Sequence, residues 1–191
     1  MSNQAAATKV VTGVVRLSYA HVFEPTAISE GNVPKYSACI LIPKSDTATY
    51  DRIQKAIQAA AEAGVSKFGG QIPKKLKTPL RDGDTDDTRG GDDDCAGCWF
   101  INASSKTKLG IVDKAGNPIL NSEEVYSGCY AHASMNFYAF NTNGNKGIAC
   151  GLNNIMKVKD GEYLGGRSKA EDDFASIIAA AGNDNDDDDL L

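Results

Sequence analysis

Between residues 126 and 140 the chain alternates with a period of two residues. Because successive side chains of a β-strand point to opposite faces, this alternation predicts a strand with one core face. The core face would carry Cys129, Ala131, Ala133, Met135, Phe137 and Ala139. The other face would carry Tyr126, Tyr130, His132, Ser134, Asn136, Tyr138 and Phe140. Aromatic rings interleaved with hydrogen-bonding groups are unusual for a buried surface, so we interpret this second face as a binding face.

A second strand is predicted directly downstream, over residues 148–159. Residues 141–147, NTNGNKG, are rich in residue types that tolerate positive φ, which predicts a hairpin connection tipped by Lys146. Two long paired strands with aromatic rings and lysines on one side indicate a nucleic-acid platform.

The chain upstream of this hairpin predicts two further strands. Residues 10–23 are rich in β-branched and aromatic types, with Gly13 allowing a bend. Residues 24–35 contain two prolines and predict a loop. Residues 36–42, YSACILI, predict the next strand, because Pro43 cannot continue it.

One substantial helix is predicted, over residues 47–63. Its apolar positions Tyr50, Ile53, Ile57 and Ala60 recur at helical spacing and form one stripe. Ser45 or Asp46 can cap its first turn, and Gly64 is a natural stop.

The remaining segments are shorter. Residues 67–81 and the aspartate-rich residues 82–94 predict irregular structure, because glycine, proline and charge interrupt any period. Short strands are predicted over residues 98–103, 109–112 and 118–120, with a turn at 114–117. After residue 166, Ser168 and Glu171 have capping-box spacing, and Phe174, Ile177 and Ile178 form a stripe.

These elements predict a mainly β (α+β) protein. The best match is an OB-fold-like five-stranded barrel with an inserted helix and extra strands and loops, because this small barrel binds oligonucleotides. Residues 1–170 would form the domain, and residues 171–191 would form a short helix and a disordered acidic tail.

The net charge of −5 over 191 residues conceals a basic body. Residues 171–191 hold eight acidic and no basic residues, so residues 1–170 carry 20 basic against 17 acidic residues, a net of +3. Setting aside residues 82–94, with seven aspartates and one arginine, leaves 19 basic against 10 acidic residues. An acidic loop and tail thus mask a cationic surface.

Location is indicated by what the sequence lacks. It has no apolar run of membrane-spanning length and no signal peptide at its start, which predicts a cytoplasmic protein without a membrane partner. The five cysteines are an odd number scattered through strand-like segments, so we expect reduced thiols and no disulfide.

Residues 82–98 suggest three metal-dependent alternatives. Cys95 and Cys98 have zinc-ligand spacing, but no second close pair of ligands accompanies them. Residues 82–93 begin like a calcium loop, but Asp87 replaces the turn glycine and Asp93 replaces the bidentate glutamate. A magnesium-dependent nuclease using these aspartates is the main enzymatic alternative, weakened because catalytic carboxylates need rigid placement. A virion or scaffolding protein is the third functional class.

Five segments resemble, in order, a phage family long catalogued as a domain of unknown function: GVVRLSYAHVFEP, KYSACILIPKSD, TPLRDGD, YSGCYAHASMNFYAFNTNGNKGIACGLNNI and DGEYLGGRSKAEDDF. Members of this family are regarded as OB-fold single-stranded DNA-binding proteins with an acidic C-terminal tail, similar in plan to the T7-type phage replication proteins. The resemblance covers roughly residues 10–174, although the aspartate-rich loop is longer and more acidic here and Cys95 is an addition. It implies a DNA-binding protein of replication or recombination, without enzymatic activity or cofactor, in the host cytoplasm.

Such a protein needs cations for phosphates and rings for bases. The candidate phosphate contacts are Lys44, Lys74, Lys75, Lys77, Arg81, Lys106, Lys108, Lys146, Lys157 and Lys159. The candidate stacking residues are Trp99, Tyr130, Tyr138 and Phe140, although Trp99 can equally be a buried strand residue. His132 shares the predicted face, but a lone histidine is more often structural.

The tail has its own predicted role. Its candidate residues are Asp184, Asp186, Asp187, Asp188, Asp189, Leu190 and Leu191. The aspartates would compete with DNA for the basic groove, and the terminal leucines would recruit replication or recombination proteins. Weaker duplex binding and a homodimer are further expectations.

Overall fold

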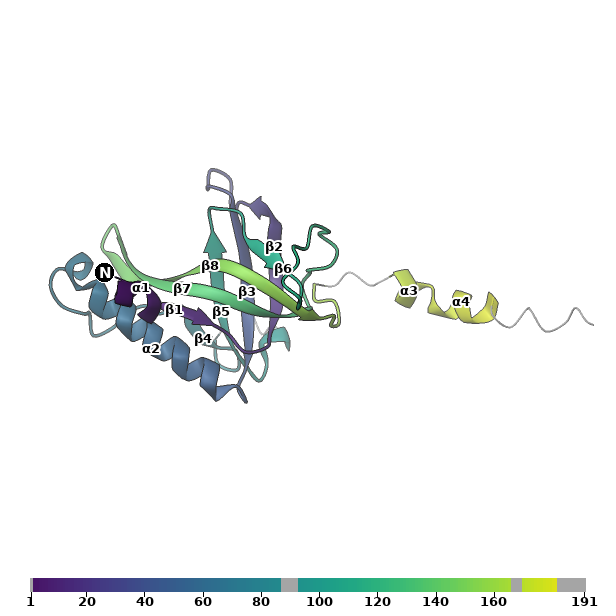
Figure 1. The fold of residues 1–191 in the computed structure, drawn as a ribbon, viewed down its shortest axis with the longest axis horizontal. Coiled ribbons are helices and arrows are strands. Elements are labelled where there is room, and N and C mark those ends of the chain that lie inside the picture. The colour runs from purple at the N-terminus through teal and green to yellow at the C-terminus, as the bar shows by residue number, and fades with distance from the viewer. Residues whose placement is uncertain (1, 87–92, 166–169, 182–191) are drawn as a thin grey trace, which may run out of the picture.

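The computed structural model describes residues 2–86, 93–165 and 170–181, and five of its strands close into a ring (Figure 1). The ring runs in the order β2, β3, β5, β8, β7 and back to β2. These strands are β2 (Val15–Thr26), β3 (Lys35–Pro43), β5 (Cys98–Ser105), β7 (Tyr130–Thr142) and β8 (Asn145–Lys159). Closure is loose, because β5 meets β8 through the single parallel pair Ser104–Gly151, so the ring is not a regular barrel.

Shorter strands and helices lie outside this ring of five strands. Three short strands are β1 (Lys9–Val11), β4 (Leu80–Asp82) and β6 (Gly110–Val112). The helices are α1 (Ser2–Ala7), α2 (Thr47–Ala63), α3 (Ala170–Asp173) and α4 (Ala175–Ala181), with 3-10 turns η1 (Val65–Phe68) and η3 (Asp93–Cys95). No helix among the described residues is long and apolar enough to cross a membrane. The mainly β fold with one substantial inserted helix confirms the predicted class.

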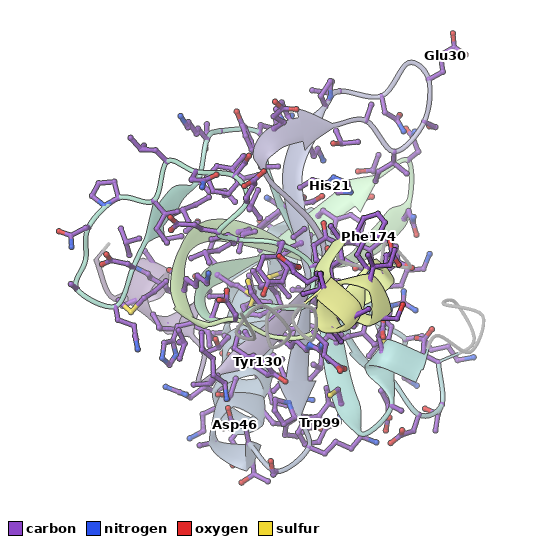
Figure 2. The ribbon with its side chains drawn as sticks, turned by 90° about the vertical axis from the view of Figure 1, so that its right-hand side faces the viewer. His21, Glu30, Asp46, Trp99, Tyr130 and Phe174 are labelled. Atoms are coloured by element: carbon purple, nitrogen blue, oxygen red, sulfur yellow. The ribbon has the colours of Figure 1, made fainter. Side chains whose placement is uncertain are left out.

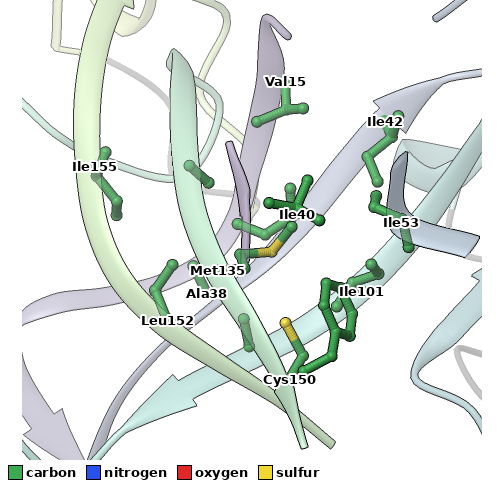
Figure 3. Packing of buried hydrophobic residues seen from close by; sticks show 14 of the residues in the cluster. Val15, Ala38, Ile40, Ile42, Ile53, Ile101, Met135, Cys150, Leu152 and Ile155 are labelled. Atoms are coloured by element: carbon green, nitrogen blue, oxygen red, sulfur yellow. The ribbon is translucent and has the colours of Figure 1, made fainter. Parts of the chain in front are cut away.

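The core face of β7 is confirmed. Cys129, Ala131, Ala133, Met135, Phe137 and Ala139 are all buried in the main cluster. Figure 3 shows Met135 of β7 facing Ile40 of β3, with Ile101 of β5 and Leu152 of β8 in the same cluster. The prediction placed the start of this strand too early, at residue 126. Gly128 has a φ of +116° and its N–H bonds to the Leu17 carbonyl oxygen, so the chain turns before the strand begins at Tyr130.

The β7–β8 connection is tighter than predicted. Asn143 and Gly144 have φ values of 52° and 81°, which makes a two-residue hairpin turn. The strands therefore extend to Thr142 and Asn145, and most of the predicted loop 141–147 belongs to the strands. The asparagines and glycines were correctly interpreted as turn formers, but only two of the seven residues make the turn.

The first predicted strand bends at Gly13, as expected, and the bend divides it into β1 and β2. The Gly13 N–H donates to the Thr49 hydroxyl at 2.9 Å, and a Cβ at this position would collide with the Asp46 carboxylate. The glycine is thus required for close approach to the start of α2.

Helix α2 has the bounds that its apolar stripe predicts, Thr47–Ala63. The Asp46 carboxylate caps it by accepting the Thr49 N–H at 3.1 Å, and Gly64 ends it. Ile53, Ile57 and Ala60 are buried against the ring. The helix therefore closes the end of the ring near the β7–β8 hairpin (Figure 1).

Other short predictions need correction. Residues 118–120 form no strand, and only an isolated bridge joins Val112 to Pro118, because proline cannot donate to a ladder. The strand predicted over residues 98–103 continues to Ser105. The segment 67–81 is not wholly irregular, since it overlaps η1 and supplies the start of β4. Ser168 and its capping box lie outside the described residues, as do residues 87–92 and 182–191.

Gly64 offers a test of the contact between α2 and β7. A Cβ added to Gly64 would overlap the Cβ of Ala139, while its φ of −97° suits any residue. We expect Gly64→Ala to lower the free energy of unfolding by about 1 to 3 kcal/mol through overpacking, measured by urea denaturation. Adding Ala139→Gly should relieve the overlap, so the double variant should be more stable than the sum of the single effects. Strict additivity would contradict this packing.

Candidate nucleic-acid interface

A row of outward-facing residues crosses the sheet from β2 to β1. Each member pairs with the next through strand register, and register partners share one face. The row comprises His21, Ser37, Ser104, Gly151, Asn136 and Lys9. Its members are small, polar or basic, and none is buried. Their strand neighbours, such as Ala38, Ala103 and Phe137, are core residues, which fixes this row on the outside of the ring.

The β7–β8 hairpin places flat aromatic surface beside this row. The Phe140 ring lies over Gly147, because a Cβ on that glycine would be 2.9 Å from the ring carbons Cε1 and Cζ. Tyr138 pairs with Ala149 and keeps 46% of its surface exposed. Since the facing β8 positions are glycine or alanine, no bulky β8 side chain covers these rings. This outer face can therefore receive stacked bases.

The other end of the row opens into a hollow at the loop of residues 27–34. The hollow has a volume of about 380 Å³ and is lined by Ile28, Val33, Lys35, Ser37 and Lys106, among others. Ile28 is 97% exposed at the loop. In an OB-fold, ligands cross the second and third ring strands between this loop and the last hairpin. Here those strands are β3 and β5.

Lysines surround the hairpin end of the face. Lys77 bridges to Gly147, and its Nζ donates to the Asn145 side chain at 2.6 Å. Lys146 donates to the Phe68 carbonyl oxygen at 2.8 Å, around the edge of the ring. Both acceptors are neutral, so both lysines keep their net charge. Lys74 and Lys75 are exposed on the segment that leads to Lys77.

Two predicted cations are neutralised by aspartates. Lys44 Nζ lies 2.7 Å from Asp82 and 2.5 Å from Asp84, and Arg81 lies 3.0 Å from Asp86. The hydrogen bonds to Asp82 and Asp84 raise the pKa of Lys44, and the hydrogen bond from Lys44 lowers the pKa of Asp82. These pairs leave Lys44 and Arg81 with little net charge for a phosphate.

The predicted aromatic row is divided between the two ends of β7. Tyr130 lies at the base of the hairpin, eight residues or about 26 Å from Tyr138. Its ring faces Lys159 Nζ at 4.8 Å and the Arg16 guanidinium at 5.6 Å, measured to the ring centroid. Lys157 pairs with Asp160 at 2.7 Å. This second basic and aromatic cluster is separate from the hairpin platform.

Trp99 lies at the other end of β3 and β5 from the loop of residues 27–34. Its ring stacks on Tyr50 of α2, with centroids 4.2 Å apart. Figure 2 shows Trp99 near Asp46, with Glu30 of the loop at the opposite extreme. His132 has a structural contact, since its Nδ1–H donates to the Thr12 carbonyl oxygen at 2.9 Å.

Several residues of this face were absent from the prediction. They are Lys9, Lys35, Ser37 and Ser104: Lys9, Ser37 and Ser104 join the face only through register between strands distant in sequence, and Lys35 lines the hollow at the loop. The single available signal was the alternation that placed Asn136 on the outer face of β7. Lys106 and Lys108, which were predicted, are exposed in the turn after β5.

The described residues provide no ligand geometry for the metal-dependent alternatives. No group of three or more histidine, cysteine, aspartate or glutamate side chains gathers as a metal site within residues 2–86, 93–165 and 170–181. Asp82 and Asp84 instead bind Lys44, and Asp84 also accepts the Gly97 N–H at 2.8 Å. The five cysteines, all in the described part of the chain, form no disulfide.

The ring and its open outer face define an OB-fold protein of the oligonucleotide-binding class. A family described as the Enterobacter phage Enc34 single-stranded DNA-binding protein matches residues 8–191, and the chain belongs to this family. A curated relative is the putative protein p50 of Acyrthosiphon pisum secondary endosymbiont phage 1. It is 30% identical over 183 residues, which cover 90% of this chain and 95% of the relative.

Solved structures agree with this assignment. The single-stranded DNA-binding protein of bacteriophage Enc34, in complex with single-stranded DNA, superposes with a TM-score of 0.72 at 25% identity, covering 83% of this chain and 90% of that chain. The gp2.5 single-stranded DNA-binding protein of bacteriophage T7 shares the fold with a TM-score of 0.58 at 17% identity, covering 88% of this chain and 93% of that chain. The predicted resemblance and OB-fold class are confirmed.

Proposed function

We propose that this chain binds single-stranded DNA without sequence preference during phage DNA replication and recombination. The observation that carries the proposal is the uncovered outer face that runs from the loop of residues 27–34 to the β7–β8 hairpin, in a member of a single-stranded DNA-binding family. The strand crosses β3, β5 and β8 and stacks bases on Tyr138 and Phe140.

The charges beside this path supply the phosphate contacts. Lys35 and Lys106 line one end, and Lys77 lies at the other. Lys146, Lys74 and Lys75 add positive potential around the hairpin. Because phosphates and ring faces are common to every nucleotide, these contacts give affinity with little sequence preference. Lys44 and Arg81 are left out of the path because aspartates already pair with them.

Binding without catalysis is favoured over the alternatives. The family consists of DNA-binding proteins rather than nucleases or scaffolding proteins. Asp82, Asp84 and Asp86 of the proposed nuclease loop serve as ion-pair partners of Lys44 and Arg81. Duplex DNA should bind more weakly, because its paired bases cannot stack on the rings.

One binding assay separates these classes. Labelled oligo(dT), a duplex of equal length and an RNA strand would be titrated with the protein, with a parallel magnesium incubation examined for cleavage. We expect a shift of oligo(dT) at micromolar protein, weaker duplex binding and intact DNA. Cleavage, or no shift of oligo(dT), would overturn the proposal.

The body and the C-terminal tail of the chain have different proposed roles. Residues 1–170 form the DNA-binding domain, and residues 171–191 contribute a short helical part and an acidic tail. The tail aspartates, which lie outside the described residues, compete with DNA for the basic face, and Leu190 and Leu191 recruit replication or recombination proteins. The protein acts in the host cytoplasm and forms a homodimer.

Deleting residues 183–191 tests the competition. Tethering gives the aspartates an effective concentration in the millimolar range, but salt screens exposed charges over about 8 to 10 Å. We therefore expect the deletion to raise oligo(dT) affinity several-fold at low salt, with the difference shrinking as salt rises. Equal affinities at low salt would leave the tail only a role in solubility.

A further inference from the structure

An apolar pocket on the outer face of β7 and β8 lies beside the Lys9 end of the outward-facing row, and none of its lining residues belongs to that row or to the proposed stacking residues. It has a volume of about 440 Å³, lies between β1 and β6, and has Val11, Val112 and Met156 among its lining residues. Val11 is 50% exposed and Met156 is 36% exposed, so apolar surface is open to solvent. We call this hollow the outer pocket.

The rim of the outer pocket is basic. Arg52 of α2 lines it, and its guanidinium donates to the Thr49 hydroxyl at 3.1 Å rather than to a carboxylate. His132 also lines the pocket. Lys9 lies two residues from Val11 on the same face of β1 and is exposed. The pocket thus combines an apolar floor with a positive edge.

A second unpartnered apolar surface lies on residues 170–181, the C-terminal helical segment. Phe174, Ile177 and Ile178 are 54%, 64% and 58% exposed, and no residue of α4 is buried. Phe174 joins α3 to α4, and its carbonyl oxygen accepts the Ile178 N–H at 2.9 Å, so the helical spacing of three and four residues gathers the three side chains on one side. The segment carries three acidic residues, at positions 171–173, and no basic residue. In Figure 1, α3 and α4 stand apart from the ring.

We propose that the C-terminal helical segment of one copy docks in the outer pocket of a second copy bound beside it on single-stranded DNA. This inference rests on the proposed function. The apolar stripe covers Val11, Val112 and Met156, and the acidic first turn faces Arg52 and Lys9. Amphipathic helices bind apolar grooves in this way, through anchors three and four residues apart.

The occupant is a second copy because the acidic, apolar segment complements the basic, apolar pocket in charge and surface, and no residue of α4 is buried against its own ring. Such a contact is heterologous and joins copies head to tail. A shared DNA strand holds neighbouring copies at high effective concentration, so a weak contact suffices to pair them. The consequence is cooperative coating of long single strands.

Two single variants test the two sides of the contact, the pocket and the segment, one at a time. Val11→Asp places a charge in the pocket, and Ile177→Asp places one on the stripe. Both side chains are exposed and lie off the DNA path, so melting temperatures should match the wild type. We expect both variants to half-saturate long oligo(dT) at about ten-fold higher concentration, while affinity for an oligonucleotide that holds one copy stays within about two-fold.

A mixture supplies the decisive comparison. Val11→Asp copies retain the segment and Ile177→Asp copies retain the pocket, so an equimolar mixture should regain pairing on an oligonucleotide that holds two copies. Failure of the mixture to regain pairing, or equal behaviour of wild type and variants on long oligo(dT), would overturn the inference. If the segment instead docks within its own copy, the variants should change affinity equally for long oligo(dT) and for an oligonucleotide that holds one copy. That result would also overturn the inference. If the wild type binds neither length, the proposed function fails first.

Discussion

Replacing Phe137 by alanine should lower the free energy of unfolding by about 3 to 5 kcal/mol. The Phe137 side chain is 2% exposed and belongs to the main core cluster, so its removal leaves a cavity that the surrounding strands cannot fill. Urea denaturation of the full chain measures the loss. This is the largest stability effect that we predict for a single side chain on β7.

Tyr138→Ala is the matched variant, because the two residues are adjacent on β7 and point to opposite faces. Tyr138 is 46% exposed, so its removal should change the melting temperature little. Oligo(dT) affinity should fall roughly 5- to 150-fold, since one stacked base contributes about 1 to 3 kcal/mol. If the two variants melt alike and bind alike, the assignment of the two faces is wrong.

Salt should weaken binding strongly. If Lys35, Lys77, Lys106 and Lys146 neutralise about four phosphates, a slope of roughly −0.7 per phosphate predicts a loss of about fifty-fold between 50 and 200 mM salt. Fluorescence anisotropy with labelled oligo(dT) over a salt series measures this slope. An affinity independent of salt would exclude a phosphate-based mechanism.

Charge removal refines this prediction. The double variant Lys77→Gln and Lys106→Gln removes one cation from each end of the path, so the loss over the same salt range should shrink to about seven-fold. Lys44→Gln is the control, because Lys44 is held by Asp82 and Asp84 at 2.7 and 2.5 Å. Equal slopes for the double variant and the control would place the phosphates elsewhere.

Local patterns were sufficient to predict α2 and the faces of β7. The stripe of Ile53, Ile57 and Ala60 and the stop at Gly64 are short-range signals, and the structure follows them. The alternation of β7 placed Phe137 inside and Tyr138 outside for the same reason. The boundary at Tyr130 was missed because Gly128 turns the chain through contacts with β2, which are distant in sequence.

The interface itself could be predicted only in part. A sequence shows that lysines are present, but it does not show that Lys44 faces Asp82 and Asp84, 38 and 40 residues away. Ser37 and Ser104 were overlooked because serine carries no distinctive signal, and only pairing between β3 and β5 brings them together. Nucleic-acid faces are assembled by register, which single-sequence periodicity does not contain.

Site-specific cross-linking tests the proposed DNA path most directly. A photoreactive residue would replace Ser37 or Ser104, which pair on the outer face of β3 and β5, and Gln58, exposed on α2, would serve as the control position. After ultraviolet irradiation with labelled oligo(dT), we expect cross-links from positions 37 and 104 and none from position 58. Cross-links from position 58 with none from the other two would contradict a path across this face.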